Sequence, residues 1–235
     1  ITPWTMELPG TVDCLESFTT VASSFCRKTI KTPHVAILGD SHAGALFSGF
    51  VQNPNSDFNQ IVVYGSGSCQ PSLGYAQERP GCNTQLKTSL MLVAQDPNIK
   101  TVVLTSYFRP LIFNNLEVRA RYKTGYSNTF DFILKNRKNV IVILDTPTLD
   151  FSPNICIKRR PYYLTKEYLN LECSYPLEDH KTQRIHYNSF MKDLALKYPQ
   201  IIFYDPTDIF YKANKIWAIL DGNLMYADFN HMNSF

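Results

Sequence analysis

The chain has 235 residues, 44% of them hydrophobic, which is enough to bury the core of one large domain or two small ones. Twenty-three Lys and Arg residues against 20 Asp and Glu residues leave a formal net charge of +3, which excludes the dense basic surface on which a dedicated nucleic-acid binder depends. No apolar run approaches the roughly 20 residues that a membrane-spanning helix needs, so we expect a soluble domain.

The first 30 residues show no sustained hydrophobic periodicity. They contain Pro3, Pro9, Gly10 and two cysteines, so we expect an irregular linker or extension over residues 1–30 that packs on the main body. The chain starts at Ile1 without an initiator Met or a signal peptide, which indicates an excised domain or a mature product.

Short runs of Val, Ile and Leu alternate with amphipathic stretches from His34 onwards. Such alternation is typical of a parallel sheet covered by helices on both faces. It predicts an α/β fold over residues 31–235, a three-layer α/β/α sandwich with a mostly parallel central sheet. The predicted elements are, in chain order, a strand at 35–38, a helix at 43–51, a strand at 61–64, a helix at 84–94, a strand at 101–105, a helix at 130–135, a strand at 140–144, a helix at 177–198 and a strand at 201–204.

A stretch at about 147–176 interrupts this alternation, and we interpret it as an insertion loop. It contains two cysteines, the basic cluster Lys158–Arg160 and the pair Tyr162–Tyr163. These basic and aromatic residues could contact an anionic, ring-rich glycan, or they could belong to an ordinary solvated loop.

Six cysteines occur as three neighbouring couples, and none has the spacing of a metal site. We interpret each couple as a disulfide, although six cysteines allow roughly 15 pairings and the alternative is a set of buried thiols. Disulfides indicate an oxidising compartment. The chain has no Asn-x-Ser/Thr acceptor for glycosylation, which favours a bacterial periplasm or cell surface over a eukaryotic secretory route. The expected pairs are Cys14–Cys26, Cys69–Cys82 and Cys156–Cys173.

A serine follows the first predicted strand at the point where the chain turns into a helix. The strand leads into Gly39, Asp40 and Ser41, so Ser41 lies at a helix N-terminus, where free amides stabilise negative charge. An oxyanion that forms beside Ser41 could therefore be stabilised by the amide of Ser41 itself. The alternative is an ordinary helix cap, because Asp and Ser both cap helices well.

A second candidate element lies near the C-terminus, where Asp228 precedes His231 by three positions. A serine nucleophile needs a base, and the base needs a partner that fixes its tautomer. Asp228 and His231 could present both groups from one tight turn, with one ring nitrogen on the carboxylate and the other free. The alternative is a surface turn with an incidental histidine.

The remaining histidines and acids have simpler interpretations. His42 points about 100° away from Ser41 on the helix, so we expect a structural role for it. Asp40 is expected to order the turn. His180 and His186 fall on the charged helix at 177–198 and are expected to be solvated.

The two candidate elements together resemble a known superfamily. The segment Ile37–Gly44, which contains Gly-Asp-Ser-His, and the later Asp-x-x-His of residues 228–231 are similar to the SGNH/GDSL hydrolases. In particular, they resemble the periplasmic SGNH domain fused to membrane acyltransferase family 3 proteins, which O-acylate bacterial surface glycans. The segments Gly67–Pro71 and Leu144–Pro147 and the ending Leu224–Asn233 support the resemblance.

The resemblance implies a role for each matching residue. Ser41 would be the nucleophile, His231 the general base and Asp228 its orienting partner. The oxyanion donors would be the amides of Ser41 and of Gly67, or of a neighbour within residues 65–68. Many SGNH enzymes also place an Asn after the third strand, but this chain has Thr105–Arg109 there, which favours the acyltransferase-linked subfamily. Arg109 or Ser106 could replace the missing amide donor.

By resemblance, we expect an O-acyltransferase that carries an acyl group, above all acetyl, on Ser41 and transfers it to a sugar hydroxyl of a bacterial envelope glycan such as lipopolysaccharide O-antigen. The acyl donor would come from a membrane acyltransferase domain N-terminal to Ile1, and the chain would be a periplasmic domain of an inner-membrane protein or, alternatively, a secreted protein. We expect no cofactor in this domain and no metal. The alternatives are a carbohydrate acetylesterase and a non-catalytic glycan-binding module.

Overall fold

The computed structural model describes residues 8–17, 24–53, 60–74, 79–109, 113–157 and 173–233. Its main sheet has seven strands in the order β1-β2-β4-β3-β5-β6-β8. The strands from β4 to β8 are parallel, whereas β1 and β2 are antiparallel to their neighbours. The strands are β1 (Thr11–Asp13), β2 (Ser24–Thr29), β3 (Val35–Gly39), β4 (Ile61–Ser66), β5 (Thr101–Thr105), β6 (Asn139–Ile143) and β8 (Ile202–Tyr204).

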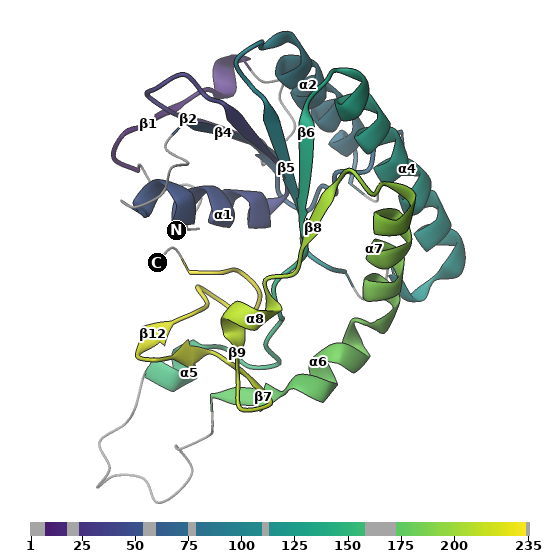
Figure 1. The fold of residues 1–235 in the computed structure, drawn as a ribbon. Coiled ribbons are helices and arrows are strands. Elements are labelled where there is room, and N and C mark those ends of the chain that lie inside the picture. Colours follow the sequence, from purple (N-terminus) through teal and green to yellow (C-terminus); the bar gives the residue numbers. More distant parts are fainter. Residues whose placement is uncertain are drawn as a thin grey trace, which may run out of the picture.

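Helices cover both faces of this sheet (Figure 1). The side chains of β3 alternate between the two faces: Ile37 packs in the cluster that includes α1, and Leu38 packs in the cluster on the opposite face. The structure is therefore the expected three-layer α/β/α sandwich with a mostly parallel sheet. One face is covered by α1 (Ser41–Gln52), and the other by α2 (Cys82–Gln95), α4 (Leu116–Lys135) and α7 (Ile185–Lys197).

The N-terminal residues differ from the sequence prediction. We expected an irregular extension over 1–30, but β1 and β2 add two antiparallel strands to the main sheet, and the 3₁₀ turn Leu15–Ser17 lies between them. The backbone of β2 pairs with β4 from Ser24 to Lys28, so these residues belong to the domain body. Pro3 lies outside the described residues.

Two helical predictions also change. The helix predicted at 130–135 is the last part of α4, which starts at Leu116. The single helix predicted at 177–198 is divided at Arg184 into α6 (Leu177–Gln183) and α7. Both differences lie in stretches where polar and charged residues dilute the hydrophobic periodicity.

Each neighbouring cysteine couple forms a disulfide. Cys14–Cys26 links the turn after β1 to β2, and Cys69–Cys82 links the loop after β4 to the first residue of α2. Cys156–Cys173 joins α5 (Asn154–Ile157) to the residue before β7 (Ser174–Pro176). The expected insertion at 147–176 includes these two elements, whereas Lys158–Arg160 and Tyr162–Tyr163 lie outside the described residues.

A smaller unit packs beyond the carboxyl ends of the parallel strands (Figure 1). Its core contains Leu149, Tyr175, Phe210, Ile216 and Tyr226. It includes a three-stranded sheet of order β7-β10-β9 and the hairpin β11-β12. Its remaining elements are α8 (Thr207–Phe210), β9 (Tyr211–Lys212), β10 (Lys215–Trp217), β11 (Ile219–Leu220) and β12 (Asn223–Leu224).

The strand order changes direction at β3, which makes the carboxyl end of β3 a topological switch point. The chain passes from β3 to β4 on one side and then to β5 on the other, and ligands of open α/β sheets bind at such a switch point. Gly39 ends β3 opposite Thr105, where an added Cβ would lie 1.8 Å from the Thr105 carbonyl oxygen. Within the described residues, no helix is both long and apolar enough to cross a membrane.

Candidate active site

Ser41 is the first residue of α1, directly after the carboxyl end of β3. Asp40 caps the helix, and its Oδ1 accepts a hydrogen bond from the amide of His42 at 3.0 Å. The first amides of a helix have no partner within the helix. Ser41 therefore combines a hydroxyl group with a backbone amide at the positive end of α1.

The structure brings Ser41, His231 and Asp228 together from opposite ends of the chain. The Ser41 Oγ lies 2.7 Å from His231 Nε2, and His231 Nδ1 lies 2.7 Å from Asp228 Oδ2. Asp228 Oδ1 accepts the amides of Asn230 and His231 at 2.9 and 2.8 Å, which closes the tight turn expected from the sequence. The arrangement matches that of a Ser-His-Asp nucleophile system.

The Asp228 carboxylate is held in its charged form. Partial burial acts to raise its pKa, but hydrogen bonds from the His231 ring and from the two amides of the turn outweigh burial and lower the pKa to about 2. Asp228 is therefore ionised at neutral pH. A carboxylate on Nδ1 favours the tautomer in which Nε2 is unprotonated, and an unprotonated Nε2 could accept the Ser41 proton.

A second histidine–carboxylate pair, His42 and Asp145, lies next to the His231–Asp228 pair. His42 Nδ1 is 2.8 Å from Asp145 Oδ1, and both side chains are almost fully buried, at 5% and 1% exposed. The His42 ring centroid lies 4.7 Å from that of His231. Burial acts to lower the pKa of His42, but the carboxylates of Asp145, Asp40 and Asp228 outweigh it and raise the pKa.

The buried carboxylates of Asp40 and Asp145 also accept hydrogen bonds from the loop after β5. Asp40 Oδ2 accepts the amide of Tyr107 at 3.0 Å, and Asp145 Oδ2 accepts the amide of Phe108 at 2.6 Å. This loop occupies the position where many SGNH enzymes have the Asn donor. Sequence reasoning placed Asp145 in the segment Leu144–Pro147, which supports the resemblance, but gave it no role of its own.

Gly67 and Arg109 lie around the neighbouring loop after β4. Gly39 of β3 pairs with Gly65 of the adjacent strand β4. Ser41 lies two residues after Gly39, and Gly67 lies two residues after Gly65. Arg109 Nη2 donates to the Ser68 carbonyl oxygen at 3.0 Å, and Arg79 Nη1 donates to the Gly67 carbonyl oxygen. Arg109 therefore contacts the backbone of this turn, and its role as an oxyanion donor stays a prediction.

His180 lies on α6 and His186 on α7. His186 is exposed, as expected. The expectation for His180 is wrong: it is 4% exposed and contacts Tyr175 and Arg184. Burial and the Arg184 charge lower its pKa to about 4. Among the residues that the structure describes, no group of three His, Cys, Asp or Glu side chains could hold a metal ion.

Comparisons with known proteins complete the description of this site. The family model of the SGNH domain fused to AT3 domains matches residues 13–235. The chain is similar to the periplasmic domain of a lipopolysaccharide acetyltransferase from Salmonella ser. Paratyphi A, with 18% identity and a TM-score of 0.59 over 87% of this chain and 80% of that one. It is also similar to a Bacteroides fragilis protein that carries the provisional name of an acylhydrolase, with 15% identity and a TM-score of 0.45 over 87% and 83%. No curated protein sequence matches the chain.

Proposed function

We propose that this chain, which belongs to the family of SGNH domains fused to AT3 domains, is an acyl-transfer enzyme. In this proposal, Ser41 is the nucleophile. The observation that carries this proposal is the continuous hydrogen-bonded series from Ser41 Oγ through the His231 ring to Asp228, with both contacts at 2.7 Å. In it, His231 acts as the general base and Asp228 orients the ring and stabilises the imidazolium that forms.

The first step transfers an acyl group from an ester or thioester donor to the enzyme. Ser41 Oγ attacks the acyl carbon and loses its proton to His231 Nε2, and the new Oγ–C bond replaces the bond to the donor oxygen or sulfur. The leaving group takes the proton from His231. The negative charge on the acyl oxygen would be stabilised by the amides of Ser41 and Gly67.

The second step passes the acyl group to an acceptor hydroxyl. His231 removes the hydroxyl proton, the acceptor oxygen attacks the acyl-Ser41 carbon, and Ser41 Oγ recovers its proton. We propose that the acceptor is a sugar hydroxyl of a bacterial envelope glycan such as lipopolysaccharide O-antigen, and that acetyl is among the acyl groups transferred. The name of the Salmonella domain with the same fold supports this acceptor class.

The acyl donor is proposed to come from a membrane partner. The family is described by its fusion to AT3 domains, so we propose that a membrane acyltransferase domain supplies the acyl donor. Three disulfides fit an oxidising compartment, which supports a periplasmic location for the domain.

A carbohydrate acetylesterase is the second candidate, because it uses the same acyl-Ser41 intermediate and resolves it with water. To separate the two, the domain is joined to a membrane acyltransferase domain and supplied with a chromogenic acetyl ester and a candidate glycan, and free acetate and acylated sugar are both measured. Acylated sugar that depends on Ser41 is the expected result. Release of acetate with no acylation of the sugar would contradict the transferase and favour the esterase.

A further inference from the structure

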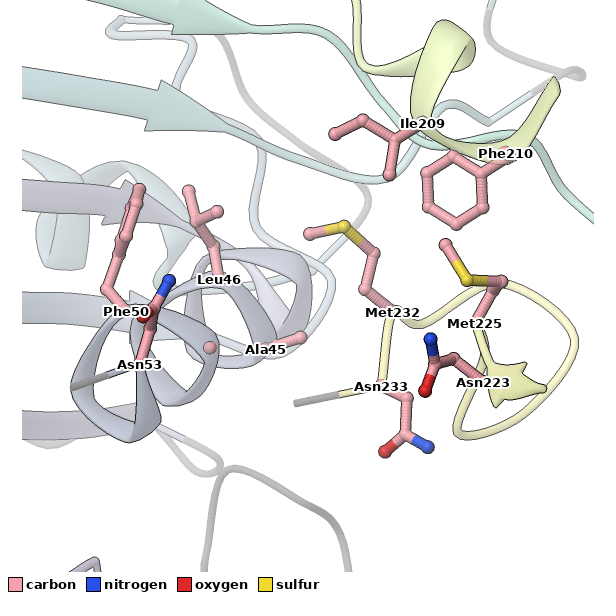
Figure 2. A pocket seen from close by; sticks show the side chains of 11 residues that line it. Ala45, Leu46, Phe50, Asn53, Ile209, Phe210, Asn223, Met225, Met232 and Asn233 are labelled. Carbon is pink, nitrogen blue, oxygen red and sulfur yellow. The ribbon is translucent and has the colours of Figure 1, made fainter. Parts of the chain in front are cut away.

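An apolar cavity of about 450 Å³ lies between α1 and the C-terminal part of the chain (Figure 2). Figure 2 shows α1 side chains on one side and side chains from α8 and the segment after β12 on the other. None of the described residues that line it is charged. We call this cavity the α1 groove; it is lined by Ala45, Leu46, Gly49, Phe50, Asn53, Ile209, Phe210, Asn223, Met225, Met232 and Asn233.

Neither Ser41 nor His231 lines the α1 groove, but each of its two walls contains residues that follow one of them closely in the chain. On α1, Ala45 and Gly49 follow Ser41 by four and eight residues, so they share its face, and Gly49 lies about 12 Å along the helix axis from Ser41. On the opposite wall, Met232 directly follows His231. An isolated bridge between Tyr226 and Met232 fixes the backbone of this wall.

The shape and chemistry of the groove fit a hydrocarbon chain. Ala45 and Gly49 are small, and apart from the neighbours of Gly49 and the α1 backbone, no heavy atom lies within 4 Å of the position that a Cβ on Gly49 would take. Met225 and Met232 supply flexible, polarizable side chains that adapt to apolar ligands of different lengths. A sugar would need convergent polar partners, whereas the polar residues here are three Asn side chains, of which Asn233 already donates to the Leu224 carbonyl oxygen.

We infer that the α1 groove binds the hydrocarbon chain of an acyl group longer than acetyl while that group is attached to Ser41. The inference rests on the proposed function and specifies its acyl substrate class. The acyl carbonyl oxygen faces the amides of Ser41 and Gly67, and the chain extends from the acyl carbon along α1 past Ala45 and Gly49.

The first test measures kcat/KM of the purified 235-residue chain for p-nitrophenyl acetate, hexanoate and decanoate. Burial of each added methylene group is expected to raise kcat/KM about fourfold. A flat profile with hydrolysis that depends on Ser41 would overturn the groove assignment and leave the proposed function intact. Absence of Ser41-dependent hydrolysis of all three esters would instead overturn the proposed function.

The second test fills the groove. Gly49→Leu places a side chain into the open space, and the ratio of kcat/KM for decanoate to that for acetate is expected to fall at least tenfold. Gln52→Leu is the matched control, because Gln52 is an exposed α1 residue that does not line the groove, and it should keep the wild-type ratio.

A charge at the rim provides a variant that does not depend on packing. Ile209 is 48% exposed, so Ile209→Asp is compatible with folding and should also lower the ratio, about tenfold. Circular dichroism checks the fold of each variant. A wild-type ratio in the folded variants, or an increase only in KM for an acceptor sugar, would overturn the inference.

Discussion

Two histidine–carboxylate pairs lie side by side near the carboxyl end of β3, with nearly equal contacts of 2.7 Å in His231–Asp228 and 2.8 Å in His42–Asp145. Their surroundings differ. The His231–Asp228 pair is 12% and 44% exposed, whereas the His42–Asp145 pair is 5% and 1% exposed. Only His231 has its second ring nitrogen on a serine hydroxyl.

The difference shows that a histidine–carboxylate contact alone does not define a general base. His231 sits on a turn that solvent and substrate can reach, so its ring can exchange a proton with Ser41 and with a leaving group. His42 and Asp145 are enclosed by the sheet and its loops, and their carboxylate also accepts a backbone amide. We therefore propose a role in the reaction for the exposed pair and structural support for the buried pair.

Removal of Ser41 or His231 should have the largest effect. Ser41→Ala and His231→Ala are each expected to lower kcat by about a millionfold, because a nucleophile and its base act as one unit. Ester hydrolysis measures the loss, and circular dichroism verifies that the variants fold. Near-normal turnover in His231→Ala together with inactivity in His42→Ala would reverse the comparison between the two pairs.

Asp228→Asn should be the next most damaging change to activity. The amide no longer fixes the His231 tautomer, so kcat is expected to fall about 10⁴-fold, less than in Ser41→Ala. The midpoint of urea unfolding should change little, because Asp228 is 44% exposed. A variant that loses stability but keeps its kcat would show that Asp228 has a structural role.

Asp145→Asn, unlike Asp228→Asn, should mainly lower the stability of the fold. It leaves His42 buried without its charged partner, and loss of one member of a buried ion pair typically costs about 3–5 kcal/mol of folding free energy. Urea unfolding of the wild type and the variant gives this difference directly. Equal stability of the two proteins would remove the buried ion pair from the account.

The same pair should make stability depend on pH. The pKa of His42 is raised in the folded state above its ordinary value of 6.5, so the pair contributes stability that is fully present below that value and is lost as pH rises through the raised pKa. The gap in unfolding free energy between wild type and His42→Gln should therefore be widest below about pH 6. A gap that widens as pH rises would contradict a protonated His42.

Arg109→Lys should have the smallest effect. Arg109 donates to the Ser68 carbonyl oxygen, and an ammonium group cannot reproduce the planar set of guanidinium donors, so we expect kcat to fall about tenfold with little change in KM. A change in KM alone would place Arg109 in substrate binding. Unchanged kcat and KM would remove it from the site.

The sequence predicted the parallel part of the fold because that part depends on local patterns. The strands β3 to β6 consist mainly of buried or half-buried Val, Ile and Leu residues, and such runs have few alternative interpretations. β2 was missed because its sequence, from Ser24 to Thr29, is mixed polar and apolar and is specified mainly by pairing with β4. Long-range pairing of this kind leaves little local signal.

The candidate site divides in the same way. Ser41, Asp228 and His231 carry short motifs, so residues 190 positions apart could be assigned to one site, and the structure brings them together. The pairing of Asp145 with His42 could not be found, because the two residues are 103 positions apart and no spacing rule connects them. The burial of His180 was missed because it depends on contacts with Tyr175 and Arg184.

The central claim is that Ser41 is a nucleophile activated by His231, and covalent labelling tests it most directly. The wild-type chain is treated with a fluorophosphonate probe, and the modified residue is identified by peptide mass spectrometry. The account predicts one adduct on Ser41, no adduct in Ser41→Ala and strongly slowed labelling in His231→Ala. A folded wild-type chain that stays unlabelled where a known serine esterase reacts would contradict the claim and favour a glycan-binding module.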